Sequence, residues 1–471
     1  MAKFEIKDGV AIIPEGTTRI GAYAFAGCSL LESVTIPESV EVIGWHAFGG
    51  CFSLKNITIP ESVTEIRGGA FCACTSLESI VIPNSVKVIR RGAFLECISL
   101  KSITIPESVH EIEDGAFEGC TSLESVVLHN RMSISNAIFK GCTSLKNITF
   151  PEWLYVIGDE AFAGCASLKS IIIPESVKKI GDCAFLDCSS LKSIIIPESV
   201  IEIGDNAFGR CTSLKSIIIP ESVKKIGEGA FWDCSSLKSI TIPESVIEIG
   251  DNAFCECYSL KSIIIPESVT KIGIAAFCEC ASLESVTLSE SVTYIDSDAF
   301  LGCTSLKSII IPKSVTNIEG CAFLCCTSLE SIVVAEGNPK YDSREGCNAI
   351  IETKSNTLIY GGKSTIIPES VTKIGNDAFD RCRSLESITI PESVEEIGEC
   401  AFCNCESLKS ITLPESVTKI GEAAFDDCSA LTAIYVPAKK VDYYKELLPE
   451  ELHGKIVEIA PEKKTKTEKE C

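Results

Sequence analysis

Cysteine is the side chain with the widest chemistry in this sequence, which contains 27 cysteines but only four histidines. A thiolate can bind a metal ion, attack an electrophile or exchange with a disulfide. Cys255 and Cys278 each begin a Cys-x-Cys pair at equivalent places in adjacent copies of a repeat, which could bring several thiolates together around a zinc ion. Cys-x-Cys is not a spacing typical of zinc sites, so we expect no metal site.

Most of the cysteines share one local setting. Seventeen of them follow a Phe by three residues, from Cys28 to Cys428, and the other ten lie outside this pattern. In a stacked chain, thiols in register stand about one strand spacing, ~4.8 Å, apart, which is too far for a disulfide bond of ~2.05 Å. We therefore expect buried, reduced thiols, which suit a reducing cytosol.

The other reactive side chains recur with the repeat and form no unique constellation. Asp and Glu are abundant, but their pairs need no acid–base explanation because they recur in copy after copy. The Ser of the recurring Pro-Glu-Ser-Val segment has no unique base partner, and the sequence has no P-loop and no Gly-x-Gly-x-x-Gly after a strand. We expect no catalytic residue, no cofactor and no enzyme activity. The alternative is a thiol-rich metal-binding or enzymatic protein.

A repeat of 23 residues positions all of these side chains. Its landmark is a Phe, which is usually preceded by Ala and followed after three, six and nine residues by Cys, Leu and Ile or Val. Repeats of this length indicate a stacked architecture. The landmark residues are Phe25, Phe48, Phe71, Phe94, Phe117, Phe139, Phe162, Phe185, Phe208, Phe231, Phe254, Phe277, Phe300, Phe323, Phe379, Phe402 and Phe425.

Each copy has room for two short extended segments and little else. Residues 191–196 alternate and are rich in β-branched side chains, which predicts a strand with its Leu and two Ile residues pointing inward. Pro197 ends the strand because it has no N–H to donate. Residues 199–203 form a second extended run, and residues 206–208 can form a helical or 3₁₀ turn. Neighbouring copies must bury the apolar face that one copy leaves open. The predicted fold is a mostly-β, right-handed repeat solenoid, built as one elongated domain with a parallel sheet and short helical or 3₁₀ turns.

The pattern Leu-x-x-Ile-x-Ile-Pro-x-Ser-Val-x-x-Ile-Gly-x-x-Ala-Phe-x-x-Cys resembles the Treponema pallidum-type leucine-rich repeat of the bacterial surface protein A-like (BspA-like) family. The resemblance covers about residues 10–436. It implies a leucine-rich-repeat-like solenoid that binds proteins, and some members of the family are adhesins. We therefore expect a non-catalytic protein–protein interaction scaffold for a protein or peptide partner, with an adhesin-like role implied by the resemblance alone.

The charge and the hydropathy pattern limit the partners and the location. A net charge of −23 argues against nucleic acid and anionic membranes as partners. No stretch of 18 apolar residues is present, so we expect no membrane insertion. The first eight residues do not have the pattern of a signal peptide. We expect a cytoplasmic monomer, and the alternative is a cell-surface location reached by an unrecognised export route.

Two outward rows of the principal sheet mark the expected partner-binding surface, because apolar residues beside charges are typical of interaction sites. The alternative is a solvated face. Stacked lysines repel one another, although a row of Glu after the prolines could offset this if it lies near enough. The apolar row is Ile172, Ile195, Ile218, Thr241 and Ile264, the basic row is Lys169, Lys192, Lys215, Lys238 and Lys261, and the acidic row is Glu175, Glu198, Glu221, Glu244 and Glu267.

The two ends of the chain depart from the repeat. Residues 1–24 are expected to form an N-terminal cap and residues 437–461 a C-terminal cap, because the ends of a solenoid core must be covered. The charged residues 462–471 should be disordered. The elements expected in the caps are a pairing of residues 4–6 with 11–13, a helix over 441–448 and a strand over 455–459.

The repeat region, residues 25–436, is interrupted twice. Near residues 129–133 the Pro-Glu-Ser-Val segment is lost, which predicts a local bend or, alternatively, a recognition irregularity. Near residues 335–363 there is an insertion. Its two alternating runs, 349–353 and 357–360, predict a β-hairpin around a polar turn. This hairpin is either absorbed by the solenoid or contacts a ligand.

Overall fold

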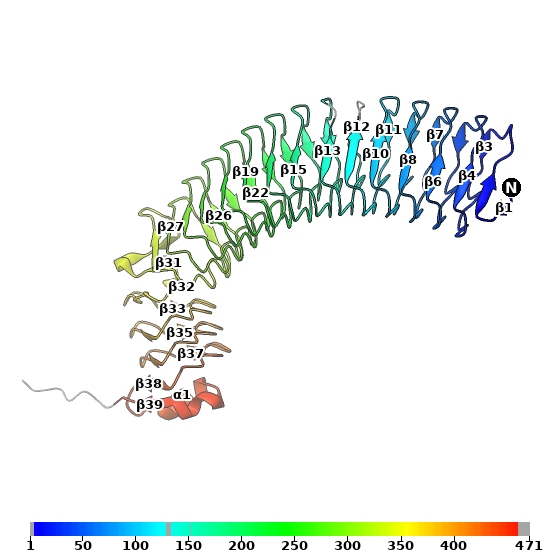
Figure 1. The fold of residues 1–471 in the computed structure, drawn as a ribbon. Coiled ribbons are helices and arrows are strands. Elements are labelled where there is room, and N and C mark those ends of the chain that lie inside the picture. The colour runs from blue at the N-terminus through cyan, green and yellow to red at the C-terminus, as the bar shows by residue number, and fades with distance from the viewer. Residues whose placement is uncertain (1–3, 129–132, 151, 460–471) are drawn as a thin grey trace, which may run out of the picture. The chain divides into compact units, whose positions relative to one another are not determined.

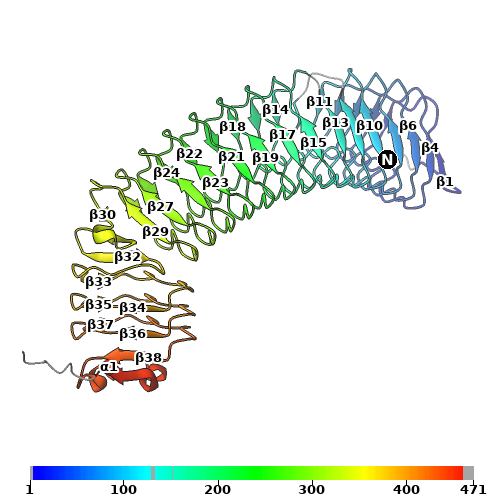
Figure 2. The same cartoon turned by 60° about the vertical axis from the view of Figure 1, so that its left-hand side comes forward.

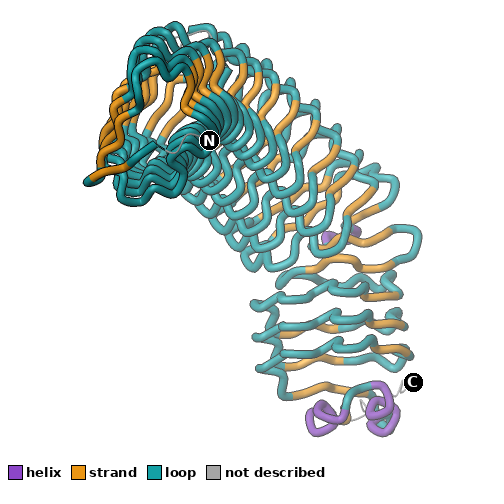
Figure 3. Tube along the Cα trace, turned by 90° about the vertical axis from the view of Figure 1, so that its right-hand side faces the viewer, coloured by secondary structure: helices purple, strands orange, loops and turns teal. Residues whose placement is uncertain are grey.

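The computed structural model describes residues 4–128, 133–150 and 152–459. In this part of the chain nearly every repeat forms one coil with two short strands joined by turns, and the coils follow one another along the chain (Figure 1). Strands and turns dominate, and helices are few (Figure 3). The predicted parallel-strand solenoid is thus confirmed. The predicted disordered tail, 462–471, and most of the irregular segment near 129–133 lie outside the described residues.

The contacts within the chain group its residues into two units, residues 1–260 and 261–471. We call them unit 1 and unit 2 and describe each by itself. The repeat pattern passes through the boundary without a break. A single elongated domain therefore stays a prediction.

The first strand of each coil shows the expected alternation of buried and exposed side chains. In β17 (Ser193–Ile195), Ile194 is buried and Ile195 is exposed. Ile194 pairs in parallel with Ile171 of β15 (Ser170–Ile172), so equivalent residues form columns across the coils. The other first strands of unit 1 are β2 (Val10–Ile12), β4 (Ser33–Thr35), β6 (Asn56–Thr58), β8 (Ser79–Val81), β10 (Ser102–Ile105), β12 (Ser125–Leu128), β13 (Asn147–Thr149), β19 (Ser216–Ile218) and β21 (Ser239–Thr241).

The second strand of each coil has two residues, of which the Ile is the inward one. In β18 (Glu202–Ile203) the Glu is half-buried and Ile203 is buried. These strands also pair in parallel from coil to coil. The other second strands of unit 1 are β3 (Arg19–Ile20), β5 (Val42–Ile43), β7 (Glu65–Ile66), β9 (Val88–Ile89), β11 (Glu111–Ile112), β14 (Val156–Ile157), β16 (Lys179–Ile180), β20 (Lys225–Ile226) and β22 (Glu248–Ile249).

Unit 2 repeats this arrangement on both sides of the insertion. Its first strands are β23 (Ser262–Ile264), β25 (Ser285–Thr287), β27 (Ser308–Ile311), β29 (Ser331–Val334), β34 (Ser387–Thr389), β36 (Ser410–Thr412) and β38 (Ala433–Val436). Its second strands are β24 (Lys271–Ile272), β26 (Tyr294–Ile295), β28 (Asn317–Ile318), β33 (Lys373–Ile374), β35 (Glu396–Ile397) and β37 (Lys419–Ile420).

The segment around each landmark Phe is a chain of tight turns and not a continuous 3₁₀ helix. Two positions in it are left-handed, as Asn206 (φ 52°) and Arg210 (φ 57°) show for the coil of Phe208. A left-handed residue interrupts a right-handed helix, so only single i→i+3 hydrogen bonds form. The turns also bond to the next coil, because Phe208 N donates to Ala230 O at 2.8 Å. This side of the solenoid is therefore a third hydrogen-bonded stack.

Stacked phenylalanines form the centre of the core. In unit 1 the landmark rings from Phe25 to Phe254 follow one another with centroids 5.1–5.8 Å apart. All of these rings are buried. Burial of one Phe stabilises the fold by roughly 1.5–3 kcal/mol, so this column supplies a large part of the core.

The first and the last described coils each pair with the elements that were expected beside them. β1 (Ile6–Lys7) pairs antiparallel with β2, and the Phe4 ring stacks on Phe25 with centroids 5.1 Å apart. At the other end lie α1 (Val441–Leu447), the 3₁₀ helix η2 (Glu450–Lys455) and β39 (Ile456–Glu458), which pairs with β38. Tyr444 of α1 is buried and its hydroxyl donates to Pro414 O.

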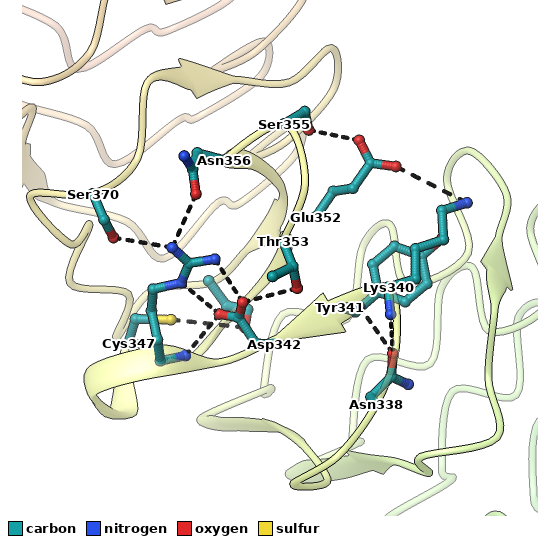
Figure 4. A network of polar contacts seen from close by, with 12 residues as sticks. Asn338, Lys340, Tyr341, Asp342, Cys347, Glu352, Thr353, Ser355, Asn356 and Ser370 are labelled. Carbon is teal, nitrogen blue, oxygen red and sulfur yellow. Dashed lines mark hydrogen bonds and ion pairs between the residues drawn. The ribbon is translucent and has the colours of Figure 1, made fainter.

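The insertion in unit 2 is an ordered element of the solenoid. It contains β30 (Tyr341–Asp342), the 3₁₀ helix η1 (Arg344–Gly346), β31 (Ala349–Glu352) and β32 (Thr357–Gly361). The predicted hairpin is confirmed, since β31 pairs antiparallel with β32. Its polar side chains bond mostly to one another (Figure 4). Arg344 donates to both Asp342 carboxylate oxygens, at 2.7 and 2.6 Å, and the Asn338 amide bonds to four backbone groups of unit 2. The strand pairing and these hydrogen bonds support the interpretation that the solenoid absorbs the insertion.

Candidate functional site

We call the stacked first strands of the coils the first sheet and the stacked second strands the second sheet. The predicted apolar row of unit 1 forms one exposed column on the first sheet. Ile172, Ile195 and Ile218 are 83%, 77% and 78% exposed. They pair in register with one another and with Thr241 across β15, β17, β19 and β21, which lie side by side in Figure 2. We call these four residues the isoleucine column. An outward Ile leaves apolar surface in water, so this column is a candidate contact surface.

The predicted basic row runs beside it. Lys169, Lys192, Lys215 and Lys238 each stand three residues before a member of the isoleucine column, and all four are exposed. We call them the lysine column. The last two residues of the prediction, Lys261 and Ile264, are exposed as well but belong to unit 2. The structure thus brings eight of the ten predicted residues together on one sheet of unit 1.

In most other coils the position of the lysine column alternates in charge. Lys101 Nζ lies 3.6 Å from Glu78 Oε2 in the preceding coil, and Lys146 Nζ lies 2.9 Å from Glu124 Oε2. Unit 2 has the same arrangement, with Lys409 Nζ 2.6 Å from Glu386 Oε2. The run that leads up to the lysine column in unit 1 is Glu32, Lys55, Glu78, Lys101, Glu124 and Lys146.

The lysine column breaks this alternation. Its four members make no ion pair with any part of the chain that the structure describes, and the acidic row after the prolines does not come within ion-pair distance of them. Like charges opposite one another in a sheet destabilise it. The break coincides with the isoleucine column, in positions where other coils of unit 1 often carry Thr, as at Thr35, Thr58 and Thr104.

The second sheet of the same coils keeps its charges alternating. Lys179, Glu202, Lys225 and Glu248 are paired in register across β16, β18, β20 and β22. Lys179 Nζ lies 3.4 Å from Glu202 Oε1. The same stretch of chain therefore satisfies charge pairing on one sheet and violates it on the other, which singles out the first sheet.

The cysteines that follow a landmark Phe by three residues, which we call the ladder cysteines, have a second role that the sequence did not reveal. Cys51 Sγ donates to Phe25 O at 3.2 Å, and the same bond recurs in unit 1 at every later ladder cysteine as far as Cys257, at 3.1–3.3 Å. The acceptor lies 25 or 26 residues earlier, in the preceding coil. Cysteine is thus a small core residue that also satisfies a buried carbonyl. Its recurrence three residues after every landmark Phe is the signal that could have indicated a donor.

In the insertion, the equivalent carbonyl group, that of Phe323, accepts its hydrogen bond from a different side chain. Phe323 O has no cysteine 26 residues later, because that residue is Ala349. Instead, the Tyr360 hydroxyl of β32 donates to Phe323 O at 2.6 Å, and the Tyr360 ring meets the Phe323 ring edge to face. Gly361 then makes room for Phe379, whose ring would lie 2.3 Å from a Cβ at this position. Tyr360 and Gly361 therefore continue the core through the insertion.

Burial controls the chemistry of the ladder thiols. It raises the pKa of Cys51 and of Cys120 to about 12, and it raises the pKa of Cys211 as well. A thiol that stays protonated is neither a good nucleophile nor a metal ligand. Among the described residues, no group of three or more His, Cys, Asp or Glu side chains is arranged to hold a metal ion. The ladder thiols from Cys51 to Cys257, whose pKa is raised by burial, therefore stay protonated near neutral pH.

We expect thiol reagents to distinguish the two classes of cysteine. In the native protein, mapping by mass spectrometry should find the ladder thiols from Cys51 to Cys257 unmodified, because they are buried. The half-exposed thiols of Cys183, Cys321 and Cys400 should react. In denatured protein without reductant, all 27 cysteines should react. A small number of free thiols in the denatured chain would contradict the assignment of reduced cysteines.

No helix among the described residues is long and apolar enough to cross a membrane.

Comparisons with known proteins connect this architecture to bacterial repeat proteins. A family model described as the BspA type leucine-rich repeat region matches residues 10–124, 111–238, 224–344 and 360–451. No significant match was found among curated proteins. A solved leucine-rich repeat protein of Bacteroides ovatus is 28% identical, with 96% of this chain and 92% of that chain covered and a TM-score of 0.50.

Two further solved structures are similar to parts or most of the chain. The T. pallidum leucine-rich repeat protein is 37% identical over 34% of this chain and 77% of its own, with a TM-score of 0.32. A leucine-rich cell surface protein of Faecalibacterium prausnitzii is 24% identical, with 93% of this chain and 90% of that chain covered and a TM-score of 0.39.

Proposed function

This chain belongs to the BspA type leucine-rich repeat family, and from that premise we propose that it is a non-catalytic scaffold that binds a protein or peptide partner. The contact surface is the isoleucine column together with the lysine column. A solenoid repeats one geometry many times, which favours an extended partner over a small metabolite. The buried thiols favour a reducing compartment such as the cytoplasm, and an adhesive role would require the same surface outside the cell.

The observation that carries this proposal is the local loss of charge alternation. Four unpaired lysines in register cost stability, and the chain avoids that cost at this position in most other coils and on the second sheet of the same coils. Features that cost stability concentrate where a protein functions, because binding can offset the cost. The lysines lie beside the most exposed isoleucines of the first sheet in unit 1. The surface therefore complements an apolar partner with negative charge.

Restoring the alternation should stabilise the protein and abolish binding. In the variant K192E/K238E, the two new carboxylates would alternate with the ammonium groups of Lys169 and Lys215, and we expect the free energy of unfolding to rise by about 1 kcal/mol from the new pairs. When K192E/K238E is used to capture partners from cells, it should lose the proteins that the wild type retains.

A second variant tests the isoleucine column. With a captured partner, I195D/I218D should leave the fold intact and weaken binding more than tenfold, or ~1.4 kcal/mol.

The matched control makes the same two charge changes at another place in the same column. The variant K55E/K101E has the same net charge as K192E/K238E but creates a run of like charges with Glu32, Glu78 and Glu124. It should lower the free energy of unfolding and keep the partner. If both variants retain the same partners as the wild type, the binding surface is elsewhere.

A further inference from the structure

We infer that the segment bound by this surface is an amphipathic α-helix with one acidic flank, lying along the stacking direction of the coils. This inference rests on the proposed function and specifies its partner. Between the two columns runs a row of small exposed residues, Ser170, Ser193, Ser216 and Ser239. A partner can therefore approach the backbone of the sheet between two rows of longer side chains.

The width of the surface fits a helix. Each lysine stands three residues before a member of the isoleucine column on the same coil, which separates the two columns by about 10 Å at ~3.3 Å per residue. A helix with its side chains is about 10–12 Å across. A helix placed over the serine row would contact the isoleucine column with one side and the lysine column with the other.

The spacing along the columns also favours a helix. Coils paired in register stand about 4.8 Å apart, so Lys169 and Lys238 are separated by three steps, or about 14 Å. Three helical turns span about 16 Å, a difference that flexible lysine side chains can absorb. An extended strand presents one face every two residues, and three such steps span about 20 Å. Carboxylates on successive helical turns therefore match the lysines better than those of a strand.

The hydrogen bonds of the sheet exclude a partner that adds a strand to the middle of this surface. β17 and β19 are each paired on both sides, so their backbone groups are already used. A strand laid on the sheet face would leave its own N–H and C=O groups without partners from the sheet. A helix satisfies its backbone internally and needs only side-chain contacts.

The charges fix how the helix is oriented about its own axis. Its acidic flank faces the lysine column, which has no ion-pair partner within the described chain. On the other side of the isoleucine column lie the exposed carboxylates of Glu175, Glu198, Glu221 and Glu244. The helix therefore carries acidic, apolar and basic residues in this order around its contact face, which excludes a uniformly acidic polymer as the preferred ligand.

The test is a selection from displayed, randomised 18-residue peptides on the full-length protein, with counter-selection on K192E/K238E. We expect enriched peptides to repeat Asp or Glu at every third or fourth position beside apolar residues. A selected peptide should be helical by circular dichroism when bound. It should bind at least tenfold more weakly to I195D/I218D and normally to K55E/K101E. Proline in its centre should abolish binding, because proline breaks a helix.

Two other outcomes would overturn the inference in different ways. Enriched peptides with a period of two, or competition by polyglutamate as strong as by the selected peptide, would show that the surface binds ligands but not a helix. The helix would then be wrong and the proposed binding surface would stand. If no peptide distinguishes the wild type from K192E/K238E, the binding surface itself is wrong.

Discussion

Raising the pH from 7 to 10 should unfold this protein at a urea concentration that it withstands at neutral pH. The ladder thiols from Cys51 to Cys257 stay protonated in the folded state because burial raises their pKa, to about 12 for Cys51 and Cys120. In the unfolded chain a thiol ionises near pH 8.5. Above that pH the unfolded state binds fewer protons than the folded state, so each buried thiol lowers the free energy of unfolding by up to ~1.4 kcal/mol per pH unit.

The effect is large because many thiols act in the same direction. Their contribution is fully present below about pH 8.5 and is lost as the pH rises toward their folded pKa. Urea unfolding followed by circular dichroism at a series of pH values measures the slope. The variant Cys211→Val provides the control for one thiol. Because the substitution removes the hydrogen bond to Phe185 O, the variant should be less stable than the wild type at pH 7. The difference in the free energy of unfolding should shrink at pH 10, because the wild type alone loses the contribution of this thiol. A difference that stays constant with pH would contradict this explanation.

Removing one ring from the phenylalanine stack should cost about 3–5 kcal/mol. Phe208 is fully buried between Phe185 and Phe231, with ring centroids 5.4 and 5.5 Å away. The variant Phe208→Ala leaves a cavity that the hydrogen-bonded coils on both sides cannot close, and the cost of a cavity adds to the lost burial. Urea unfolding at neutral pH measures the change in the free energy of unfolding.

The same substitution at an exposed phenylalanine is the matched control. Phe52 lies four residues after a landmark Phe and is 50% exposed. Phe52→Ala should change the free energy of unfolding by less than about 1 kcal/mol. A similar loss in both variants would mean that the stack is not the main source of cohesion between coils.

The architecture could be predicted from the sequence because its determinants are local and periodic. The alternation of residues 191–196 predicts which side chains β17 buries, and the two apolar runs of the insertion predict the β31–β32 hairpin. Repetition then determines which residues stand in register. The isoleucine and lysine columns follow from that register, so the members in unit 1 could be named before the structure was known.

Features that depend on contacts between coils were harder to predict. The acceptor of each ladder thiol lies in a different coil, and only the turn geometry shows that the two atoms meet. The left-handed positions were missed because Tyr23, His46 and Cys183 occupy them, with φ between 46° and 57°. Glycine at the equivalent positions of other coils, such as Gly69 and Gly92, was the available signal.

The alternating charges of the second sheet bear on how this gene can lengthen or shorten. Loss of one 23-residue coil between β16 and β20 would place Lys179 against Lys225, whereas loss of two coils would place it against Glu248. Duplication of one coil would likewise place like charges side by side, whereas duplication of two coils would keep the charges alternating. The heritable module in this stretch is therefore a pair of coils, and homologues that differ in length here should differ by an even number of coils.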